Sequence, residues 1–311
     1  RGCTVNHFPG EHELGWKDRL ARLLRDLPLA PRTFVLPGEA GRLRQAAREA
    51  GPGQAWIVKP CHLGEGRHVR LARGALDLEG VAGDHCVVSE YVPDPLLVGG
   101  RKIDIRAYVL VAQVEPELRA FVFRNGLVRF CGDDYDLSDE GIRRIGAHVS
   151  NNAVQTRTQR HACGLNWTLR QLWAWLDEHG GPAPAVVWAR ILRAVRDTLA
   201  AWREPAAAAA ARVPGLEAVR CWSLLAFDLL IDRQGHVWLL EVNPKPALSA
   251  QSASLKAVFP VQYEVKAPLL ADLFGLLGLP DRAGGPPAPD GPGAWASPSP
   301  ELGGFVPLDF A

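Results

Sequence analysis

Two carboxylates and an amide interrupt a pair of apolar segments that the sequence predicts to be neighbouring β-strands. Asp228 stands within the apolar residues 224–231, and Glu241 and Asn243 end the segment that begins at residue 237. Two like charges held in an apolar setting are costly unless a cation joins them or one of them is protonated. Oxygen-only ligand sets are those that Mg²⁺ prefers, with phosphate oxygens and water completing the octahedron. We therefore predict a magnesium site formed by these three residues.

The length of the turn between the two strands decides whether these side chains meet. A four-residue loop at 232–235 would place Asp228 opposite Leu239. Because side chains alternate along a strand, Glu241 and Asn243 would then share the face of Asp228. The alternative is an edge hairpin whose acids simply face water.

A lysine at the end of a predicted strand could contact a phosphate. Lys59 ends the segment AWIVKP and precedes a loop that contains Gly64, Gly66 and Arg67. A lysine in this position can reach one phosphate oxygen while loop amides close over the others. The spacing fits neither the GxxxxGK[ST] nucleotide loop nor the GxGxxG dinucleotide motif. An exposed lysine beside a hairpin loop is an equally good explanation of this segment taken alone.

A third group of charged residues alternates along the segment RKIDIRAYVLV. Lys102, Asp104, Arg106 and Tyr108 share one predicted face, and apolar residues occupy the other. A solvated face would explain this alternation. If the next strand lies alongside, Arg106 and Arg124 could instead hold a carboxylate or phosphate, with Asp104 orienting one guanidinium.

The segment HVSNN at 148–152 offers further hydrogen-bonding groups. Ser150 and Asn151 would suit a phosphate or a ribose. An ordinary turn has the same composition.

Composition limits the class of protein. The chain has 311 residues, of which 47% are hydrophobic and 22% charged, with a net charge of +1. The near-neutral charge argues against a nucleic-acid-binding or membrane-surface protein, and no apolar run reaches the roughly 18 residues of a transmembrane helix. Six widely spaced cysteines without a CxxC pair favour reduced thiols and a cytoplasmic location. The chain lacks methionine, so we expect a fragment or a processed sequence.

The expected elements alternate between helix and strand. Apolar spacing predicts helices at 15–27, 164–212 and 265–279, and short strands at 55–60 and 84–92. Two longer segments, 101–114 and 118–131, are predicted to form antiparallel sheet with Asn125 and Gly126 as a hairpin turn.

The fold class is therefore α+β with mostly antiparallel strands. We expect three parts. Residues 1–54 would be the remnant of an N-terminal or central lobe, and 55–279 a catalytic domain with a helical insert at about 164–212. Residues 280–311, rich in Pro and Gly, would be a disordered tail.

Together these segments resemble the tubulin tyrosine ligase-like family of ATP-grasp ligases. The matching stretches include VNHFPGEHELGWKDRLARLLR, WIVKPCHLGEGRHVRL, VVSEYVPDPLLVGGRKIDIRAYVLV, HVSNNAVQ, LLAFDLLIDRQGHVWLLEVNPKPAL and YEVKAPLLADLFGLLG. The resemblance covers about residues 5–279. It implies an ATP-grasp fold with nucleotide between two lobes, and ATP- and Mg²⁺-dependent ligation of an amino acid to a protein carboxylate through an acyl-phosphate.

The resemblance also implies roles for the residues already named. Nucleotide phosphates would contact Lys59, Gly64, Gly66 and Arg67. Adenine would border Ser89, Glu90 and Tyr91. The amino acid and acyl-phosphate would be served by Lys102, Asp104, Arg106 and Arg124, with Ser150 and Asn151 nearby. Mg²⁺ would be held by Asp228, Glu241 and Asn243.

The segments YEVKAPLLADLFGLLG and GGRKIDIRAYVLV look most like the glutamate-adding members. The expected substrates are free glutamate and the acidic C-terminal tails of tubulin, so the expected location is the microtubule cytoskeleton, with cilium or basal body as candidates. A local basic surface for those tails could come from Arg143, Arg144, Arg157, Arg160 and Arg170, which could equally be scattered solubility charges.

Three departures from the family pattern keep other functions open. Ser89 and Glu90 stand where many members have Gln-Lys, Thr156 stands where a basic residue is usual, and Pro244 and Lys245 replace small residues. The alternatives are a tubulin glycine ligase, a catalytically inactive tubulin-binding member, and a ligase for a small metabolite.

Overall fold

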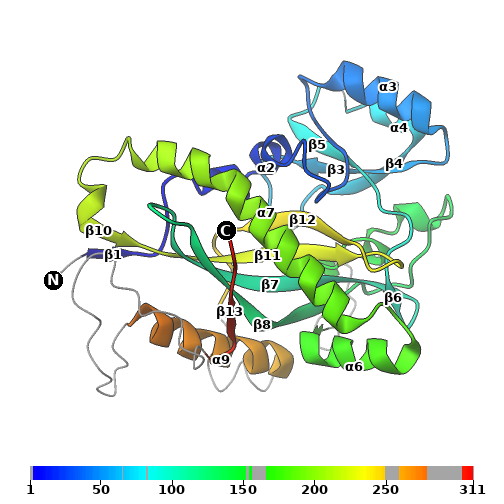
Figure 1. Cartoon of the computed structure of the whole chain (residues 1–311). Helices are drawn as coiled ribbons and strands as arrows, with labels where there is room; N and C mark the ends of the chain where they lie inside the picture. The colour runs from blue at the N-terminus through cyan, green and yellow to red at the C-terminus, as the bar shows by residue number, and fades with distance from the viewer. Residues whose placement is uncertain are drawn as a thin grey trace.

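A seven-stranded, largely antiparallel sheet forms the centre of the molecule (Figure 1). The structure is a computed structural model that describes residues 3–64, 66–81, 83–151, 154–155, 166–248, 259–278 and 303–310. The main path of the sheet follows the order β12 (Val237–Asn243), β11 (Ser223–Ile231), β7 (Arg101–Gln113), β8 (Arg119–Phe130) and β13 (Phe305–Pro307). Two short strands join it at the side, β6 (Leu97–Val98) on β7 and β9 (Asn166–Thr168) on β8.

The two faces of β7 belong to different layers because its side chains alternate. The odd-numbered residues pack into the larger core with α6 (Leu169–His179) and α7 (Pro184–Ala210). On the other face Tyr108, Leu110 and Ala112 pack against α9 (Pro260–Leu277). Figure 1 shows the sheet between α7 on one side and α9 on the other. The even-numbered residues before Tyr108 are charged, and this end of the face is where the site lies.

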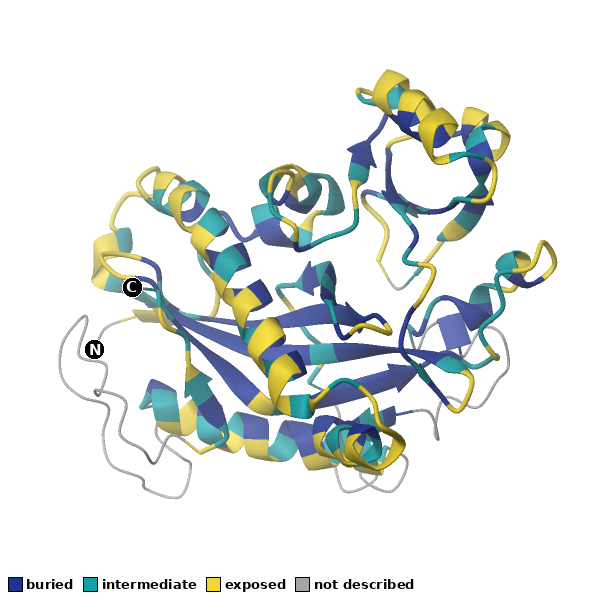
Figure 2. Cartoon of the chain, turned by 45° about the vertical axis from the view of Figure 1, so that its right-hand side comes forward, coloured by how far each residue is buried: buried dark blue, intermediate teal, exposed yellow. Residues whose placement is uncertain are grey.

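A smaller lobe is built on a four-stranded antiparallel sheet. Its order is β2 (Thr33–Val35), β5 (Cys86–Glu90), β3 (Ala55–Pro60) and β4 (Arg70–Arg73). Apolar side chains on one face of the sheet pack under α3 (Ala40–Ala50) and α4 (Gly74–Glu79), as the buried face of both helices shows (Figure 2). The sheet takes strands from both sides of residue 54, where the sequence suggests a boundary.

Short elements join the two lobes and close the far end of the molecule. The helices α1 (His12–Gly15) and α2 (Lys17–Leu23) contact β12 on one side and β2 and β5 on the other. A parallel pair is formed by β1 (Cys3–Val5) and β10 (Val219–Cys221), and single helical turns lie at η1 (Gly141–Arg143), η2 (Ile145–Ala147) and η4 (Leu216–Ala218). None of the helices in the described part of the chain is long and apolar enough to cross a membrane.

The predicted mixed class with antiparallel strands is confirmed, and several boundaries move. The helix expected at 265–279 begins earlier, at Pro260. The helical insert expected at 164–212 starts as strand β9, which pairs with β8. The expected disordered tail is corrected at its end, because Phe305–Pro307 forms β13 on the edge of β8 and Phe305 is buried.

The hairpin turn expected at Asn125 and Gly126 is wrong. Both residues lie within β8, and the chain reverses between Gln113 and Arg119 instead. A Cβ on Gly126 would lie 2.6 Å from the backbone oxygen of Arg106, so the glycine allows a close approach of two strands rather than a turn. The pairing changes register beside it, which is a bulge in the ladder.

Helix α7 is anchored to the N-terminal loop by one buried tryptophan. The Trp202 side chain is fully buried, its indole Nε1 donates to the Gly10 carbonyl at 3.0 Å, and its ring meets Phe8 edge to face. We predict that Trp202→Ala lowers the free energy of unfolding by about 3–5 kcal/mol, because it removes a large buried ring and leaves a cavity. Chemical denaturation would measure it. Val186→Ala, at an exposed position of the same helix, should cost less than about 1 kcal/mol; equal costs for the two variants would contradict this view of α7.

Candidate functional site

A cavity of about 640 Å³ lies where the two lobes face each other. Its wall takes residues from β3 and β5 of the smaller sheet, from β7, β8, β11 and β12 of the central sheet, and from α2 and α9. Most of the residues singled out in the sequence line it, namely Lys59, Gly64, Gly66, Ser89, Glu90, Tyr91, Lys102, Asp104, Arg106, Ser150, Asn151, Asp228, Glu241 and Asn243. Arg67 and Arg124 do not line the cavity, and both are exposed.

The two acids meet by a different register from the one the sequence suggests. Leu239 pairs with Leu229, and a bulge follows, so Asp228 lies directly opposite Glu241 rather than opposite Leu239. The expected turn pairs Ile231 with His236, whereas the structure pairs Ile231 with Val237, a shift of one residue. The bulge adds a second shift of one residue, so Asp228 and Glu241 are again on the same face of the sheet. Asp228 and Glu241 interact directly, and Asn243 faces the same cavity.

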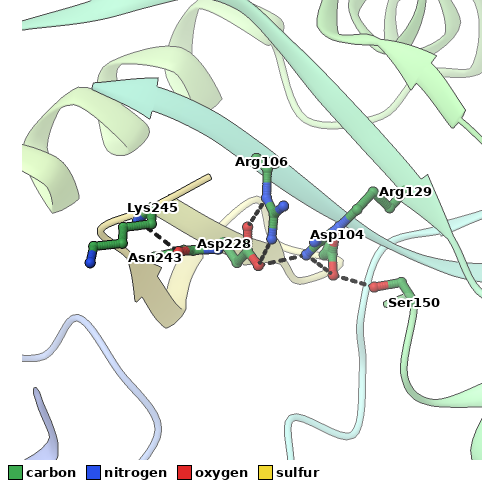
Figure 3. Close-up of polar contacts among 7 residues, drawn as sticks. All are labelled: Asp104, Arg106, Arg129, Ser150, Asp228, Asn243 and Lys245. Atoms are coloured by element: carbon green, nitrogen blue, oxygen red, sulfur yellow. Dashed lines mark hydrogen bonds and ion pairs between the residues drawn. The ribbon is translucent and has the colours of Figure 1, made fainter. Parts of the chain in front are cut away.

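Asp228 is held by two arginines (Figure 3). Arg106 donates from Nε and Nη2 to its two carboxylate oxygens, both at 2.8 Å, and Arg129 Nη2 lies 2.8 Å from Oδ2. Burial raises the pKa of this carboxyl, but the guanidinium groups of Arg129 and Arg106 outweigh burial and bring its pKa well below the usual range. Asp228 is therefore a fixed negative charge.

Arg129 is the residue that the sequence reading missed, and it takes the place proposed for Arg124. It donates to both oxygens of Asp104, from Nε at 2.6 Å and Nη2 at 2.8 Å, and also reaches Asp228. The Ser150 hydroxyl donates to the same Asp104 carboxylate. Arg129 pairs with Asp104 across the β7–β8 ladder. Even a turn placed between Gln113 and Arg119 would pair Asp104 with Val128 by parity, so only the register shifts along the ladder bring Arg129 opposite Asp104.

Glu241 carries the less compensated of the two charges. Burial and the neighbouring Asp228 carboxylate raise its pKa, and the Lys59 ammonium only partly opposes them. The Asn243 side-chain oxygen accepts a hydrogen bond from the Lys245 backbone N–H at 2.9 Å. Two adjacent carboxylates and an amide oxygen facing one cavity are hard oxygen donors, which is the ligand chemistry that suits Mg²⁺. The described residues hold no cluster of three His, Cys, Asp or Glu side chains for a metal, so a cation here would rely on Asn243 and ligand oxygens as well.

The phosphate side of the cavity is formed by the end of β3 and its loop. Burial lowers the pKa of Lys59, and the Glu241 carboxylate partly restores it. Gly66 has a φ of +65°, and a Cβ there would lie 2.5 Å from Val154 Cγ2, so the loop requires glycine at this point. Lys17 at the start of α2 donates to the Leu63 carbonyl at 2.7 Å and so connects the loop to α2.

The expected adenine segment runs along the end of β5. Ser89 Oγ is 2.8 Å from Thr33 Oγ1. Burial raises the pKa of Glu90, with Arg32 nearby as an opposing charge. The Tyr91 hydroxyl accepts from Lys102 Nζ at 3.1 Å, and the ammonium also lies over the Tyr91 ring.

Lys102 is a positioning residue in this arrangement rather than a free cation. It is buried, and besides Tyr91 it donates to the His148 carbonyl at 2.9 Å. His148 Nδ1 is 3.0 Å from the Tyr91 hydroxyl, and burial lowers the pKa of His148 to about 4, so this ring is neutral at pH 7. The solvated face considered for the charged strand is therefore wrong, because Lys102 and Asp104 are both buried.

Positive charge is in excess around the cavity. Its lining contains the cations Lys17, Lys59, Lys102, Arg106, Arg129, Lys245 and Lys266 and the acids Glu90, Asp104, Asp228 and Glu241. Every lysine in the described part of the chain is in this lining. The rest of the surface relies on arginine, and this scarcity of lysine was a sequence signal that could have led to Lys17 and Lys266. A cation-rich, partly enclosed wall favours a polyanionic ligand.

Other predicted residues lie elsewhere. Arg143, Arg144 and Arg170 are exposed. Arg157, Arg160 and Thr156 lie outside the described residues.

Comparison with known proteins gives a family match over most of the chain. The family model described as "Tubulin-tyrosine ligase family" matches residues 2–282. Tubulin monoglutamylase TTLL4 of Homo sapiens is 31% identical over 292 residues, which cover 88% of this chain and 23% of that protein. Tubulin polyglutamylase TTLL5 of Mus musculus is 30% identical over 296 residues, 88% of this chain and 21% of that protein. Tubulin polyglutamylase TTLL13 of Homo sapiens is 29% identical over 292 residues, 88% of this chain and 34% of that protein. The chain thus spans about a fifth to a third of the length of these relatives.

The two arginines of β8 provide a matched test of the site. We predict that Arg129→Gln lowers the free energy of unfolding at pH 7 by about 3–5 kcal/mol, because two buried carboxylates lose their shared cation. Arg124→Gln, on the exposed side of the same strand, should cost less than about 0.5 kcal/mol. Urea denaturation of both variants would measure the difference. Similar losses in the two variants would contradict the central place of Arg129.

The raised pKa of Glu241 predicts an unusual stability change. Its pKa in the folded protein lies above that of the unfolded chain, about 4.3, so the folded state binds the extra proton and loses stability as pH rises between the two values. Glu241→Gln should therefore raise the melting temperature of the ligand-free protein at pH 7–8, and this gain should disappear at about pH 4, where Glu241 is protonated. Thermal melts across this pH range would test it; a lower melting temperature at neutral pH would show that the charge is well compensated.

Proposed function

The chain belongs to the tubulin-tyrosine ligase family, and from that premise we propose that it is an ATP- and Mg²⁺-dependent ligase that adds glutamate to carboxylates of tubulin C-terminal tails through an acyl-phosphate. The observation that carries the proposal is the pair of facing acids, buried Asp228 and half-buried Glu241, which line a cation-rich cavity together with Lys59 and Arg106. The names of the relatives, a monoglutamylase and two polyglutamylases, favour glutamate over glycine as the donor.

The chemistry needs a carboxylate to become a good acceptor for an amine. A carboxylate oxygen of the acceptor attacks the terminal phosphorus of ATP, and ADP leaves. The amine of glutamate then attacks the carbonyl carbon, phosphate leaves, and the nitrogen loses a proton as the amide forms. Both steps involve anions approaching anions, so catalysis depends mainly on positioning and on compensating charge.

The residues of the chain divide this work. Lys59, Gly64 and Gly66 would hold the phosphates, because all three line the cavity and the Glu241 carboxylate is the charge that most raises the pKa of Lys59. Ser89 and Tyr91 would border the base. Bound Mg²⁺, held by Asp228, Glu241 and Asn243, would supply positive charge at the phosphates.

Arg106 would face the transferred group, with its orientation fixed by Asp228. The guanidinium cannot rotate freely because Nε and Nη2 are both bonded to that carboxylate. Asp228 is in turn held by Arg129, and Arg129 by Asp104. This chain of bonds would keep a cation beside the reacting phosphate without reorganisation during the reaction, which is the condition for strong electrostatic stabilisation.

The proposed partners follow from the relatives and the acceptor chemistry. Acidic tubulin tails, free glutamate and ATP would be the substrates, and the microtubule cytoskeleton, including the cilium or basal body, would be the place of action. Exposed Arg143, Arg144 and Arg170 could contact an acidic tail.

The proposal is tested by mass spectrometry of tubulin incubated with the protein, ATP, Mg²⁺ and an equal mixture of glutamate and glycine. We predict added glutamate, and a loss of at least about 100-fold in rate for Glu241→Gln and Lys59→Ala, because each removes charge from the phosphate region. Glu241→Gln is the more informative variant, since we expect it to fold at least as stably as the parent. Val186→Ala should retain the parent rate. Addition of glycine alone would redirect the donor, and no transfer together with no nucleotide binding would favour an inactive member of the family.

A further inference from the structure

The last described segment of the chain, residues 303–310, is bound at the edge of the central sheet. Its strand β13 pairs antiparallel with β8 and places Phe305 opposite Phe123, and Figure 1 shows it beside β8 and α9. The family match ends at residue 282, so this strand lies outside the part of the chain that the family pattern covers. Addition of a strand to a sheet edge is a general way in which proteins bind extended peptides.

Backbone hydrogen bonds hold the segment at both ends of β13. The Arg124 N–H donates to the Gly304 carbonyl at 2.6 Å. The Leu308 N–H donates to the Ala120 carbonyl at 2.9 Å. Because bonding alternates along an antiparallel pair, the backbone nitrogen of Pro307 points away from β8. Proline therefore fits here without the loss of a bond to β8, and it leaves the outer edge of β13 short of a donor, which discourages the addition of another strand.

The side chains of the segment contact both layers of the core. Phe305 is buried in the apolar cluster under α9, and its ring lies 5.2 Å from that of Phe123. Leu308 and Phe310 pack against the larger core on the opposite face, together with α6 and α7. In strand addition the backbone bonds supply affinity, and contacts of alternate side chains supply specificity. This segment has both kinds of contact.

Two glycines fit the segment closely to its neighbours. Gly303 has a φ of +57°, and a Cβ there would overlap the Asp272 carboxylate. A Cβ on Gly304 would overlap the ring of Phe123. The Gly304 N–H also donates to the Asp272 carboxylate at 2.8 Å. The sequence of the segment is therefore matched to this place, since glycine is required at both positions.

The position of β13 in the sheet allows it to leave without disturbing the other strands. It has three residues and pairs with β8 at the end of the main path of the sheet. Its release breaks none of the pairs among β12, β11, β7 and β8. Local opening of an edge costs less free energy than global unfolding, so a short edge strand can exchange while the rest stays folded.

The helix that receives the segment also forms part of the cavity wall. Asp272 of α9 bonds the segment, and Lys266 of the same helix lines the cavity. Phe305 belongs to the same buried cluster as Val265, the neighbour of Lys266, and as Tyr108, which also lines the cavity. Packing in this cluster therefore connects the bound segment to the wall of the cavity.

We propose that the edge of β8 at Phe121–Phe123 and the adjoining part of α9 form a binding site for an extended apolar peptide, the strand site, with residues 303–310 as its tethered ligand. The peptide class is a glycine pair followed by an aromatic residue and further apolar side chains that reach both faces of the sheet. Binding in the strand site orders α9 and with it one wall of the cavity. The strand site lies outside the cavity, so this inference goes beyond the proposed function.

Peptide capture by the full chain tests the strand site. A fluorescently labelled peptide of residues 303–310, GGFVPLDF, would be titrated into the protein and its anisotropy measured. Phe305→Ser should bind it at least about 10-fold more tightly than the parent does, because the parent site is filled by its own segment at high effective concentration. Gly303→Val, which strains the backbone at positive φ, should also capture the peptide. Pro307→Ala, at an exposed position of β13, should behave like the parent.

The specificity of capture has its own control. The same peptide carrying Phe305→Ser should not bind to any of these proteins, because it lacks the ring that enters the cluster under α9. If the Phe305→Ser chain binds no natural peptide, or fails to unfold cooperatively in a thermal melt, β13 is an integral strand and the inference is overturned.

Hydrogen exchange on the parent decides the same point without a variant. The amides of Arg124 and Leu308 bond across the β8–β13 pair, whereas Phe227 lies on β11, which is paired on both sides. We predict that the first two exchange at least about 100-fold faster than Phe227, because the edge opens locally. Equal rates would show that β13 opens only with the whole sheet and would contradict the inference.

Exchange in α9 tests the connection to the cavity wall. In Phe305→Ser the amides of Val265 and Lys266 should exchange at least about fivefold faster than in the parent, and saturating natural peptide should restore the parent rates. Exchange in α3 of the smaller lobe should not change. Unchanged rates in α9 would overturn the connection. These measurements need no turnover, so absence of glutamate transfer by the parent would bear on the proposed function and not on the strand site.

Discussion

The site depends on one buried carboxylate held by two guanidinium groups. Asp228 is buried in the sheet, where an unpaired charge would be very costly, and it is compensated by Arg106 on the neighbouring strand β7 and by Arg129 on the next strand, β8. Arg129 then passes the same constraint to Asp104. Each group fixes the next, so the cations that face the cavity have little freedom to move. A buried ionic network of this kind is weak evidence of stability, and its value here is preorganisation.

Two other charged groups in the cavity have shifted pKa values. Glu241 has a raised pKa because it lies next to Asp228, and Lys266 has a lowered one because it is buried beside Arg106. Glu241 pairs with Asp228 across the β11–β12 ladder, and Lys266 lines the same cavity from α9. Both groups favour the binding of ligands over the stability of the protein alone, which is the usual relation between stability and function at active sites.

Part of this could be read from the sequence. The acids Asp228 and Glu241 were recognisable because polar residues interrupt apolar strands, and Lys102, Asp104 and Arg106 because they alternate along one strand. The alternation was ambiguous between a solvated face and a cavity, since period 2 does not say what covers a face. Only the smaller lobe and α9, distant in sequence, decide that question.

What the sequence could not supply were register and long-range neighbours. The bulge after Asp228 and the close approach at Gly126 depend on how three strands pack, and both misled local turn rules. For that reason the sequence pointed to Arg124 as the arginine of the site, whereas the structure places Arg129 there. Lys266 was hidden in a segment that reads as an ordinary apolar helix, and its meaning appears only beside Arg106.

The most direct test of the acid pair as a cation and nucleotide site is calorimetric titration of the ligand-free protein with a non-hydrolysable ATP analogue, with and without Mg²⁺. For the parent we predict affinity that rises at least about 10-fold when Mg²⁺ is present, and for Glu241→Gln no such rise, because one of the two carboxylates is gone. Equal enhancement by Mg²⁺ in both proteins would contradict the assignment of Asp228 and Glu241 as the metal-binding acids.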